Sequence, residues 1–165
     1  MKLVRRKNSS HPYIIPMHTL IMLIGIPGSG KSRWVKSYPG KVLVVSPDEI
    51  RRRQSHVSDQ SRNIDVWIQA KEETIEGLLK ADVILDATNV STSYRRSFLE
   101  GLVCHKKAVI FPVDPVAAYK RVERDIRAGK DRARVPEEVI YRMFGEFLYT
   151  MKVIRDEFDG IEVVD

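Results

Sequence analysis

A glycine-rich octapeptide at residues 25–32 constrains this chain more than any other part of its sequence. It reads Gly25-Ile26-Pro27-Gly28-Ser29-Gly30-Lys31-Ser32, the G-x-x-x-x-G-K-S pattern of a phosphate-binding P-loop. Glycines allow backbone angles that a Cβ would forbid, so successive N–H groups can turn toward phosphate oxygens. The lysine supplies a positive charge for the β- and γ-phosphates, and the serine supplies a hydroxyl for Mg²⁺. The pattern predicts an ATP site with Lys31 as a catalytic group and Ser32 as a metal ligand.

The flanks of the octapeptide match the strand and helix that a P-loop requires. Residues 20–24 form a continuous apolar run, typical of a strand that is buried on both faces. Residues 32–37 can form a helix whose N-terminal dipole favours phosphate. These flanks disfavour the alternative of a chance glycine-rich turn. The expected nucleotide-binding residues are Gly25, Pro27, Gly28, Ser29, Gly30, Lys31, Ser32 and Arg33.

Short apolar runs alternate with amphipathic stretches along the chain, which predicts an α/β fold with a central parallel sheet flanked by helices. The expected strands are residues 19–25, 41–45, 83–85, 108–111 and 161–164. Apolar residues recur at helical spacing over 64–79 and 140–154, and we interpret both stripes as facing the core. The stripes are Ile64, Trp67, Ile68, Ile75, Leu78 and Leu79, and Ile140, Met143, Phe144, Phe147, Met151 and Ile154.

The length of 165 residues suits one domain, which we expect over 17–165. Residues 1–16 contain four basic residues and lack the apolar centre of a signal peptide, so they are interpreted as a flexible basic leader. No apolar run approaches the length of a membrane span, and we expect no membrane partner. The single cysteine, Cys104, cannot form an internal disulfide, which favours a reducing compartment such as the cytoplasm.

The chain is basic, with 28 Lys and Arg against 22 Asp and Glu and a net charge of +6. A basic balance favours polyanionic partners, of which ATP is one and a nucleic-acid strand another. The charge fits an ordinary basic enzyme equally well. It therefore does not select the substrate by itself, and the oligomeric state is left open.

A second candidate site follows the expected strand 41–45. Ser46 suits an N-cap, Pro47 suits the first helical position, and Glu49 completes a capping-box pattern. Asp48 then lies in the first helical turn, and Arg51 lies three residues further on the same face. Ligands of open α/β sheets bind beyond the carboxyl ends of the strands. Asp48 is therefore predicted to accept a proton from an attacking hydroxyl, rather than only to complement the helix dipole.

A third candidate site is Asp86-Ala87-Thr88-Asn89, which follows the apolar run Val83-Ile84-Leu85. The position of Asp86 resembles a Walker B aspartate, which would hold Mg²⁺-bound water or orient the acceptor. The alternative is a turn-forming aspartate. For Asn89 a functional role and a turn role explain the sequence equally well.

A basic segment over residues 114–134 forms the fourth candidate site. Asp114-Pro115 has the pattern of a helix start, and Tyr119, Val122 and Ile126 form one apolar stripe. Beside that stripe lie Lys120, Arg124 and Arg127, and further basic residues follow as far as Arg134. We interpret the segment as a basic lid that closes over the nucleotide, rather than as a solvated basic face.

With these four sites in order, residues 19–150 resemble the P-loop polynucleotide 5′-kinases, especially the kinase domain of the phage T4-type end-healing enzyme. The motifs that carry the resemblance are the P-loop through Arg33-Trp34, Asp48-x-x-Arg51, Asp86-Ala87-Thr88-Asn89, and Arg124-x-x-Arg127 leading to Val135-Pro136. Arg33 departs from the family pattern, in which threonine commonly follows the P-loop serine. The chain also lacks the D-x-D-x-T motif of the phosphatase module that the family often carries, so we expect the kinase step alone.

The resemblance implies a P-loop kinase fold and Mg²⁺- and ATP-dependent phosphorylation of the 5′-hydroxyl of DNA or RNA, as in nucleic-acid end repair. It implies that Asp48 is the general base and that Arg51 contacts the phosphate 3′ of the acceptor nucleoside. Lys31 and a lid arginine, Arg124 or Arg127, would serve the transferring phosphate, with Asp86 as a further catalytic residue. A small-molecule P-loop kinase and a non-catalytic nucleotide-binding module remain the alternatives.

Overall fold

The structure is a computed structural model that describes residues 13–54 and 63–165, with side chains described from residue 18 onward. Its described residues form a five-stranded sheet in the order β2-β3-β1-β4-β5, in which every neighbouring pair is parallel. The predicted α/β fold with a central parallel sheet is therefore confirmed. The strands are β1 (Tyr13–Ile24), β2 (Val42–Val45), β3 (Asp82–Leu85), β4 (Leu102–Ile110) and β5 (Gly160–Val163).

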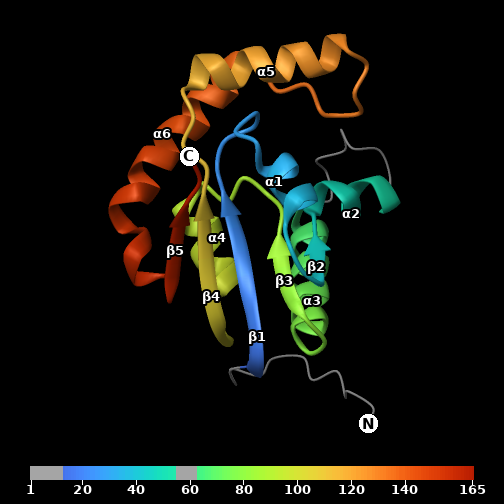
Figure 1. Cartoon of the computed structure of the whole chain (residues 1–165), viewed down its shortest axis with the longest axis vertical. Coiled ribbons are helices and arrows are strands. Elements are labelled where there is room, and N and C mark those ends of the chain that lie inside the picture. The colour runs from blue at the N-terminus through green and yellow to red at the C-terminus, as the bar shows by residue number, and fades with distance from the viewer. Residues whose placement is uncertain (1–12, 55–62) are drawn as a thin grey trace.

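Helices connect the strands and cover the sheet (Figure 1). They are α1 (Lys31–Ser37), α2 (Pro47–Gln54), α3 (Asn63–Leu78), α4 (Thr92–Leu99), α5 (Pro115–Arg127) and α6 (Glu137–Val153), followed by the 3₁₀ turn η1 (Ile154–Asp156). In Figure 1, α5 crosses above the ends toward which the strand arrows point, and α6 descends beside β5. These carboxyl ends carry the P-loop and the other loops that hold the candidate site. None of the described helices is both long and apolar enough to span a membrane.

Two strands are longer than the sequence predicts. β1 begins at Tyr13 rather than near residue 19, so residues 13–16 belong to the strand and not to the expected leader. β4 begins at Leu102, and its first residues pair with Tyr13 and Ile14 before the register shifts between Ile14 and Thr19. The early part of β4 includes a polar stretch, His105-Lys106-Lys107, so it does not form a continuous apolar run with residues 108–111. Residues 1–12 lie outside the described part of the chain.

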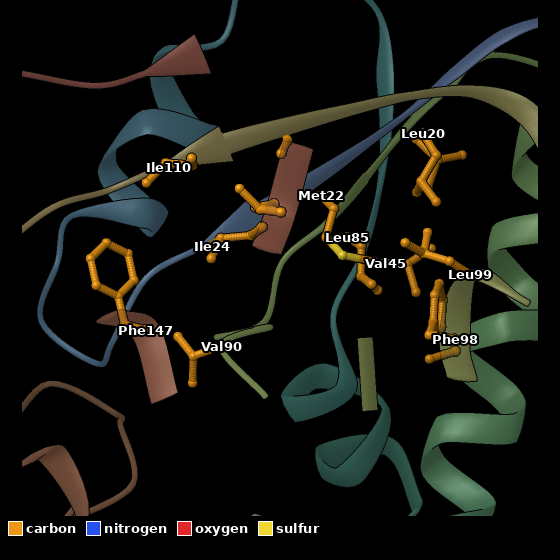
Figure 2. Close-up of a cluster of buried hydrophobic side chains, with 14 of the residues drawn as sticks. Leu20, Met22, Ile24, Val45, Leu85, Val90, Phe98, Leu99, Ile110 and Phe147 are labelled. Atoms are coloured by element: carbon orange, nitrogen blue, oxygen red, sulfur yellow. The ribbon is translucent and has the colours of Figure 1, made fainter. Parts of the chain in front are cut away.

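The core lies on both faces of the sheet, and β1 contributes to each. Leu20, Met22 and Ile24 are fully buried in the larger cluster, which also contains Phe147 of α6 (Figure 2). Ile21 and Leu23 point to the opposite face, into a smaller cluster with Phe111. Burial on both faces explains why the strand before the P-loop is continuously apolar.

The apolar stripe predicted for residues 64–79 is only partly correct. Ile64, Ile68 and Leu79 are exposed, with 78 %, 54 % and 56 % of their surface open to solvent. The buried face of α3 carries mostly smaller residues: Val66, Ala70, Thr74, Gly77 and Leu78. A Cβ on Gly77 would lie 2.8 Å from Cγ2 of Val83, so the helix approaches the sheet closely at this point. By contrast, the stripe on α6 is confirmed at Ile140 and Phe147, which are buried.

Candidate phosphate-transfer site

The P-loop connects β1 to α1 and wraps around the side chain of Lys31. The lysine is only 9 % exposed, and its Nζ donates to the carbonyl oxygens of Gly25 at 2.7 Å and Ile26 at 2.9 Å. It also lies 3.2 Å from the hydroxyl oxygen of Ser29. Burial is the main reason that the pKa of Lys31 falls from 10.5 to about 8. The ammonium therefore lies inside the loop, and a bound phosphate would provide it with a negatively charged partner.

Two P-loop glycines adopt left-handed backbone conformations, with φ of 83° at Gly28 and 100° at Gly30. A Cβ on Gly28 would lie 2.4 Å from the carbonyl oxygen of Ala118 in α5, so the loop and that helix are in close contact. Gly25 is also tightly enclosed, since a Cβ there would lie 2.6 Å from Oγ of Ser29. Gly30 therefore requires glycine because of its backbone conformation. Gly28 requires it for the same reason and because a side chain there would clash with α5.

The residues present fit a Mg²⁺-bound nucleoside triphosphate. A glycine-lined loop encloses a buried ammonium, and Ser32 in the first turn of α1 is exposed, so its hydroxyl is accessible as a metal ligand. Arg33, the next residue, is exposed as well. These placements agree with the predicted nucleotide-binding role of the loop, which stays a prediction.

The predicted helix start after β2 is present, with α2 beginning at Pro47 and the backbone N–H of Glu49 lying 3.4 Å from Oγ of Ser46. Glu49 does not close the predicted box through its own side chain, because that carboxylate pairs with Arg52 at 2.9 Å. Asp48 and Arg51 form the expected pair, with Nη1 of Arg51 2.5 Å from Oδ1 of Asp48.

The two members of this pair differ in exposure. The Asp48 side chain is 66 % exposed, whereas that of Arg51 is 12 % exposed. Nη2 of Arg51 donates to Oδ1 of Asn63, the first residue of α3, at 2.6 Å. Nε of Arg51 is buried and finds no acceptor among the described residues. The arrangement presents an accessible carboxylate beside a guanidinium that two other side chains hold in place.

Asp86 follows β3 at the same edge of the sheet, and its backbone N–H donates to the carbonyl oxygen of Val45 at 2.9 Å. Burial raises the pKa of the Asp86 carboxyl, and the nearby charge of Lys31 partly opposes that rise. Asp86 and Asp48 both act electrostatically on the Lys31 ammonium. The structure therefore brings together the side chains from the first three predicted sites.

Asn89 has a structural role that the sequence left undecided. Its side-chain Nδ2 donates to the carbonyl oxygen of Leu23 at 2.7 Å, and its backbone is left-handed, with φ of 49°. One residue earlier, the Thr88 carbonyl accepts a hydrogen bond of 3.0 Å from the backbone N–H of Gly25. Residues 86–89 thus form a turn that is joined to the start of the P-loop, and we call it the Asp86–Asn89 turn.

Helix α5 begins as predicted, with Oδ1 of Asp114 accepting from the N–H of Ala117 at 3.0 Å. From this helix, Nη1 of Arg121 donates to the carbonyl oxygen of Gly28 at 3.3 Å. Arg124 and Arg127, the arginines selected from the sequence, are both exposed, and Arg127 is 82 % open to solvent. Their contact with phosphate stays a prediction.

The loop between α5 and α6, residues 128–136, is here called the lid loop. Asp125 of α5 accepts from Lys130 at 2.7 Å and from Arg132 at 2.8 Å, which ties the loop to the helix. From α2, Arg52 lies 3.4 Å from the carboxylate of Asp131, so the loop also contacts the helix of the Asp48 site. The charge of Arg132 acts on Lys31. Arg132 is therefore the lid-loop arginine with a described electrostatic link to the P-loop.

Sequence reasoning missed several residues that support this site. Asn63 orients Arg51 from a position that only the fold reveals, since the two residues are 12 positions apart and no local spacing connects them. Asp125 and Arg132 lie within the basic segment, but their pairing was hidden among many charges. Arg95, fully buried in α4, contacts Asn89, and its burial contradicts the usual expectation for arginine. None of these four residues belongs to a local motif, unlike the P-loop residues or the pair Asp48 and Arg51.

Comparison with known proteins agrees with this architecture. A family model described as an AAA domain matches residues 20–147. A chain in the structure of the Pnkp1/Rnl/Hen1 RNA repair complex is similar, with a TM-score of 0.74 and 20 % identity over 90 % of this chain and 48 % of that one. A chain in another Pnkp1/Rnl/Hen1 complex has a TM-score of 0.57 and 24 % identity, with 70 % and 41 % covered.

A gluconokinase from Sinorhizobium meliloti 1021 is also similar, with a TM-score of 0.51 and 15 % identity over 93 % of this chain and 84 % of that chain. At these identities the three structures establish a shared fold. This chain spans about half or less of the length of the first two. The family match covers most of the chain and begins on the strand that leads into the P-loop, so the protein belongs to the AAA domain family of P-loop proteins and has the P-loop kinase fold.

Proposed function

We propose that this protein is a polynucleotide 5′-hydroxyl kinase that transfers the γ-phosphate of ATP to the 5′ end of DNA or RNA. The observation that carries the proposal is the ion pair of Asp48 with Arg51 on α2. The charge of the same aspartate acts on Lys31 of the P-loop. A proton acceptor is thus paired with a guanidinium suited to bind an acceptor phosphate, and its charge acts on the group expected to bind the nucleotide.

The roles of the residues follow from their positions. Oδ1 of Asp48 is paired with Arg51, and the exposed carboxylate leaves its second oxygen to accept the proton of an entering hydroxyl. Arg51, oriented by Asp48 and Asn63, holds the first phosphate of the acceptor strand. Lys31 and an arginine of the lid stabilise negative charge on the transferring phosphoryl group. Mg²⁺, when bound through Ser32, neutralises charge on the β- and γ-phosphates.

A polynucleotide acceptor is supported by charge as well as by the pair. The chain carries a net charge of +6, and one similar structure is an RNA repair complex. Binding of a nucleic-acid strand releases counterions, so its affinity falls as salt rises. A small uncharged acceptor would show little such dependence.

The principal competing function is a small-molecule kinase, since a gluconokinase shares the fold. The test uses γ-labelled ATP with Mg²⁺ and a panel of acceptors: 5′-hydroxyl DNA and RNA oligonucleotides, nucleosides, and sugar acids such as gluconate. Oligonucleotides that already carry a 5′-phosphate are the matched control. We expect label on 5′-hydroxyl oligonucleotides alone, with a KM that rises steeply with salt. Transfer to a small acceptor with none to oligonucleotides would contradict the proposal.

A further inference from the structure

Arg95 in α4 is an arginine with 1 % of its surface exposed, an unusual environment for a permanently charged side chain. Its Nε and Nη2 donate to the two carboxylate oxygens of Glu157 at 2.6 and 3.0 Å, and the Glu157 side chain is itself only 6 % exposed. Both charges of this fork-shaped pair are thus removed from water. A buried ion pair of this kind is weak evidence for a role in stability, because desolvation offsets most of the attraction.

Nη1 of Arg95 connects this pair to the phosphate site, while Nη2 also donates to Oγ1 of Thr92 within α4 at 3.2 Å. Nη1 donates to the backbone carbonyl of Asn89 at 2.9 Å and to Oγ1 of Thr150 at 3.0 Å. Oγ1 of Thr150 in turn donates to the carbonyl of Val90 at 2.6 Å. Arg95 and Thr150 therefore hold two successive carbonyl groups at the end of the Asp86–Asn89 turn.

The other side of the same turn contacts the P-loop. Asn89 holds the carbonyl of Leu23 on β1, and the carbonyl of Thr88 accepts from the N–H of Gly25, the first P-loop residue. Asparagine adopts the left-handed backbone of Asn89 more readily than most residues with a side chain, and hydrogen bonds on both sides of the turn hold it in this position. Arg95 and Thr150 provide that fixation from behind the site.

We propose that Arg95 and Glu157 form a positioning pair for the phosphate site, which fixes the Asp86–Asn89 turn and, through it, the start of the P-loop. Glu157 and Thr150 come after the family match, which ends at residue 147, so the end of the chain takes part in the site without touching it. The inference deepens the proposed kinase function and rests on nucleotide binding by the P-loop, whatever the acceptor is.

The test compares Arg95→Lys with Arg96→Ala. Lysine keeps the positive charge and loses the fork that spans Glu157 and Asn89. Arg96 is the matched control because its Nε lies 3.2 Å from the same Glu157 carboxylate, yet its side chain is 56 % exposed and makes no described contact with the turn. The melting temperature of each variant is measured first. Its affinity for a fluorescent ATP analogue with Mg²⁺ is then measured at least 15 °C below that temperature, where the protein is folded, a margin several times the shift of about 2–4 °C that a 1 kcal/mol destabilisation causes in a chain of this size.

We expect Arg95→Lys to weaken nucleotide binding by about tenfold, the lower end of the loss seen when a partner that orients ligand-binding groups is removed, with Arg96→Ala close to wild type. A folded Arg95→Lys protein with unchanged nucleotide affinity would overturn the proposal and leave only a structural role. Where Arg95→Lys does not fold, the near-isosteric Thr150→Val variant gives the answer, because it removes the hydroxyl that holds Arg95 and Val90. Reduced affinity in that variant supports the proposal, and wild-type affinity contradicts it.

This readout separates the inference from the function on which it rests. A wild-type protein that binds nucleotide but labels no oligonucleotide would contradict the polynucleotide kinase proposal alone. A kinase that labels oligonucleotides and binds nucleotide equally well with Arg95→Lys would contradict the positioning pair alone.

Discussion

Nη1 of Arg51 lies 2.5 Å from Oδ1 of Asp48, so the predicted base and the predicted acceptor anchor form one ion pair on the first turns of α2. The arginine is the more buried partner, and Asn63 holds its other terminal nitrogen. The carboxylate is therefore positioned by a group that is itself fixed. A substitution within the set Asp48, Arg51 and Asn63 should therefore impair use of the acceptor more than binding of the nucleotide.

Replacement of Asn63 by alanine tests whether the acceptor is affected more strongly than the nucleotide. We expect Asn63→Ala to raise the KM for a 5′-hydroxyl oligonucleotide about tenfold, since hydrogen bonds to charged groups contribute roughly 1.5–3 kcal/mol, with nucleotide affinity unchanged. Steady-state kinetics with each substrate varied separately measures the effect. Gln69→Ala, further along α3, is the control. An equal loss of nucleotide and acceptor affinity in Asn63→Ala would show that the contact with Arg51 is not specific to the acceptor.

Gly28 and Gly40 provide a matched pair for the close approach of α5 to the P-loop. Both have positive φ, 83° and 115°, but a Cβ lies 2.4 Å from the Ala118 carbonyl at Gly28 and meets nothing within 4 Å at Gly40. Gly40→Ala should lower the free energy of unfolding by about 1–2 kcal/mol through backbone strain alone. Gly28→Ala should cost more and also reduce nucleotide binding. Denaturant titration that found equal losses would show that the steric contact is not significant.

The lowered pKa of Lys31 predicts a pH dependence of nucleotide binding. Bound phosphate favours the protonated amine, so above pH 8 the free protein must take up a proton to bind, and affinity should fall by about tenfold per pH unit at the limit. In the absence of nucleotide, the effect of pH on the free energy of unfolding has the opposite sign. Between pH 8 and 10.5 the unfolded lysine binds more protons than the folded one, so the contribution of Lys31 to the free energy of unfolding increases with pH.

Calorimetry in buffers of different ionisation enthalpy measures the proton uptake directly. We expect uptake of a fraction of a proton at pH 8 that increases toward pH 9. Binding at pH 9 without proton uptake would mean that the ammonium is already charged in the free protein, contrary to its burial.

Three arginines are candidates for the proposed contact with the transferring phosphate. The sequence selects Arg124 and Arg127, whereas the structure describes both as exposed and links Arg132 to Lys31 electrostatically. We expect Arg132→Ala to reduce kcat by at least about tenfold, because arginines at a transferring phosphate stabilise developing charge. Arg124→Ala and Arg127→Ala are measured in parallel. A larger loss of kcat in Arg124→Ala or Arg127→Ala would assign the contact with the transferring phosphate to the exposed arginines of α5 instead.

The fold was largely predictable from the sequence because the inner strands of a parallel sheet are buried on both faces and are therefore continuously apolar. Runs such as Val83-Ile84-Leu85, whose side chains are all buried, therefore indicate strands, and the P-loop fixes the connection after β1. α4 was not predicted, because its buried face includes Arg95, which disrupts the apolar spacing. Ile64 and Ile68 fit a helical apolar stripe but are exposed, since periodicity does not show which apolar side chains the sheet covers.

In the candidate site, residues with local motifs were found and those defined by tertiary contact were not. Asp48 and Arg51 are three residues apart and share a helical face, so their pairing could be predicted. Arg95 and Glu157 are 62 residues apart, and no local pattern connects them.

The most direct test of the central claim is the initial rate of label transfer from γ-labelled ATP to a 5′-hydroxyl oligonucleotide by wild type and Asp48→Asn at equal nucleotide occupancy. Loss of a general base costs about 10²–10⁴-fold, so we predict robust labelling by the wild type and a loss of at least about 100-fold in the variant, with nucleotide affinity retained. Comparable labelling by both proteins would contradict the assignment of Asp48, and absence of labelling by a wild type that binds ATP would contradict the proposed polynucleotide kinase activity.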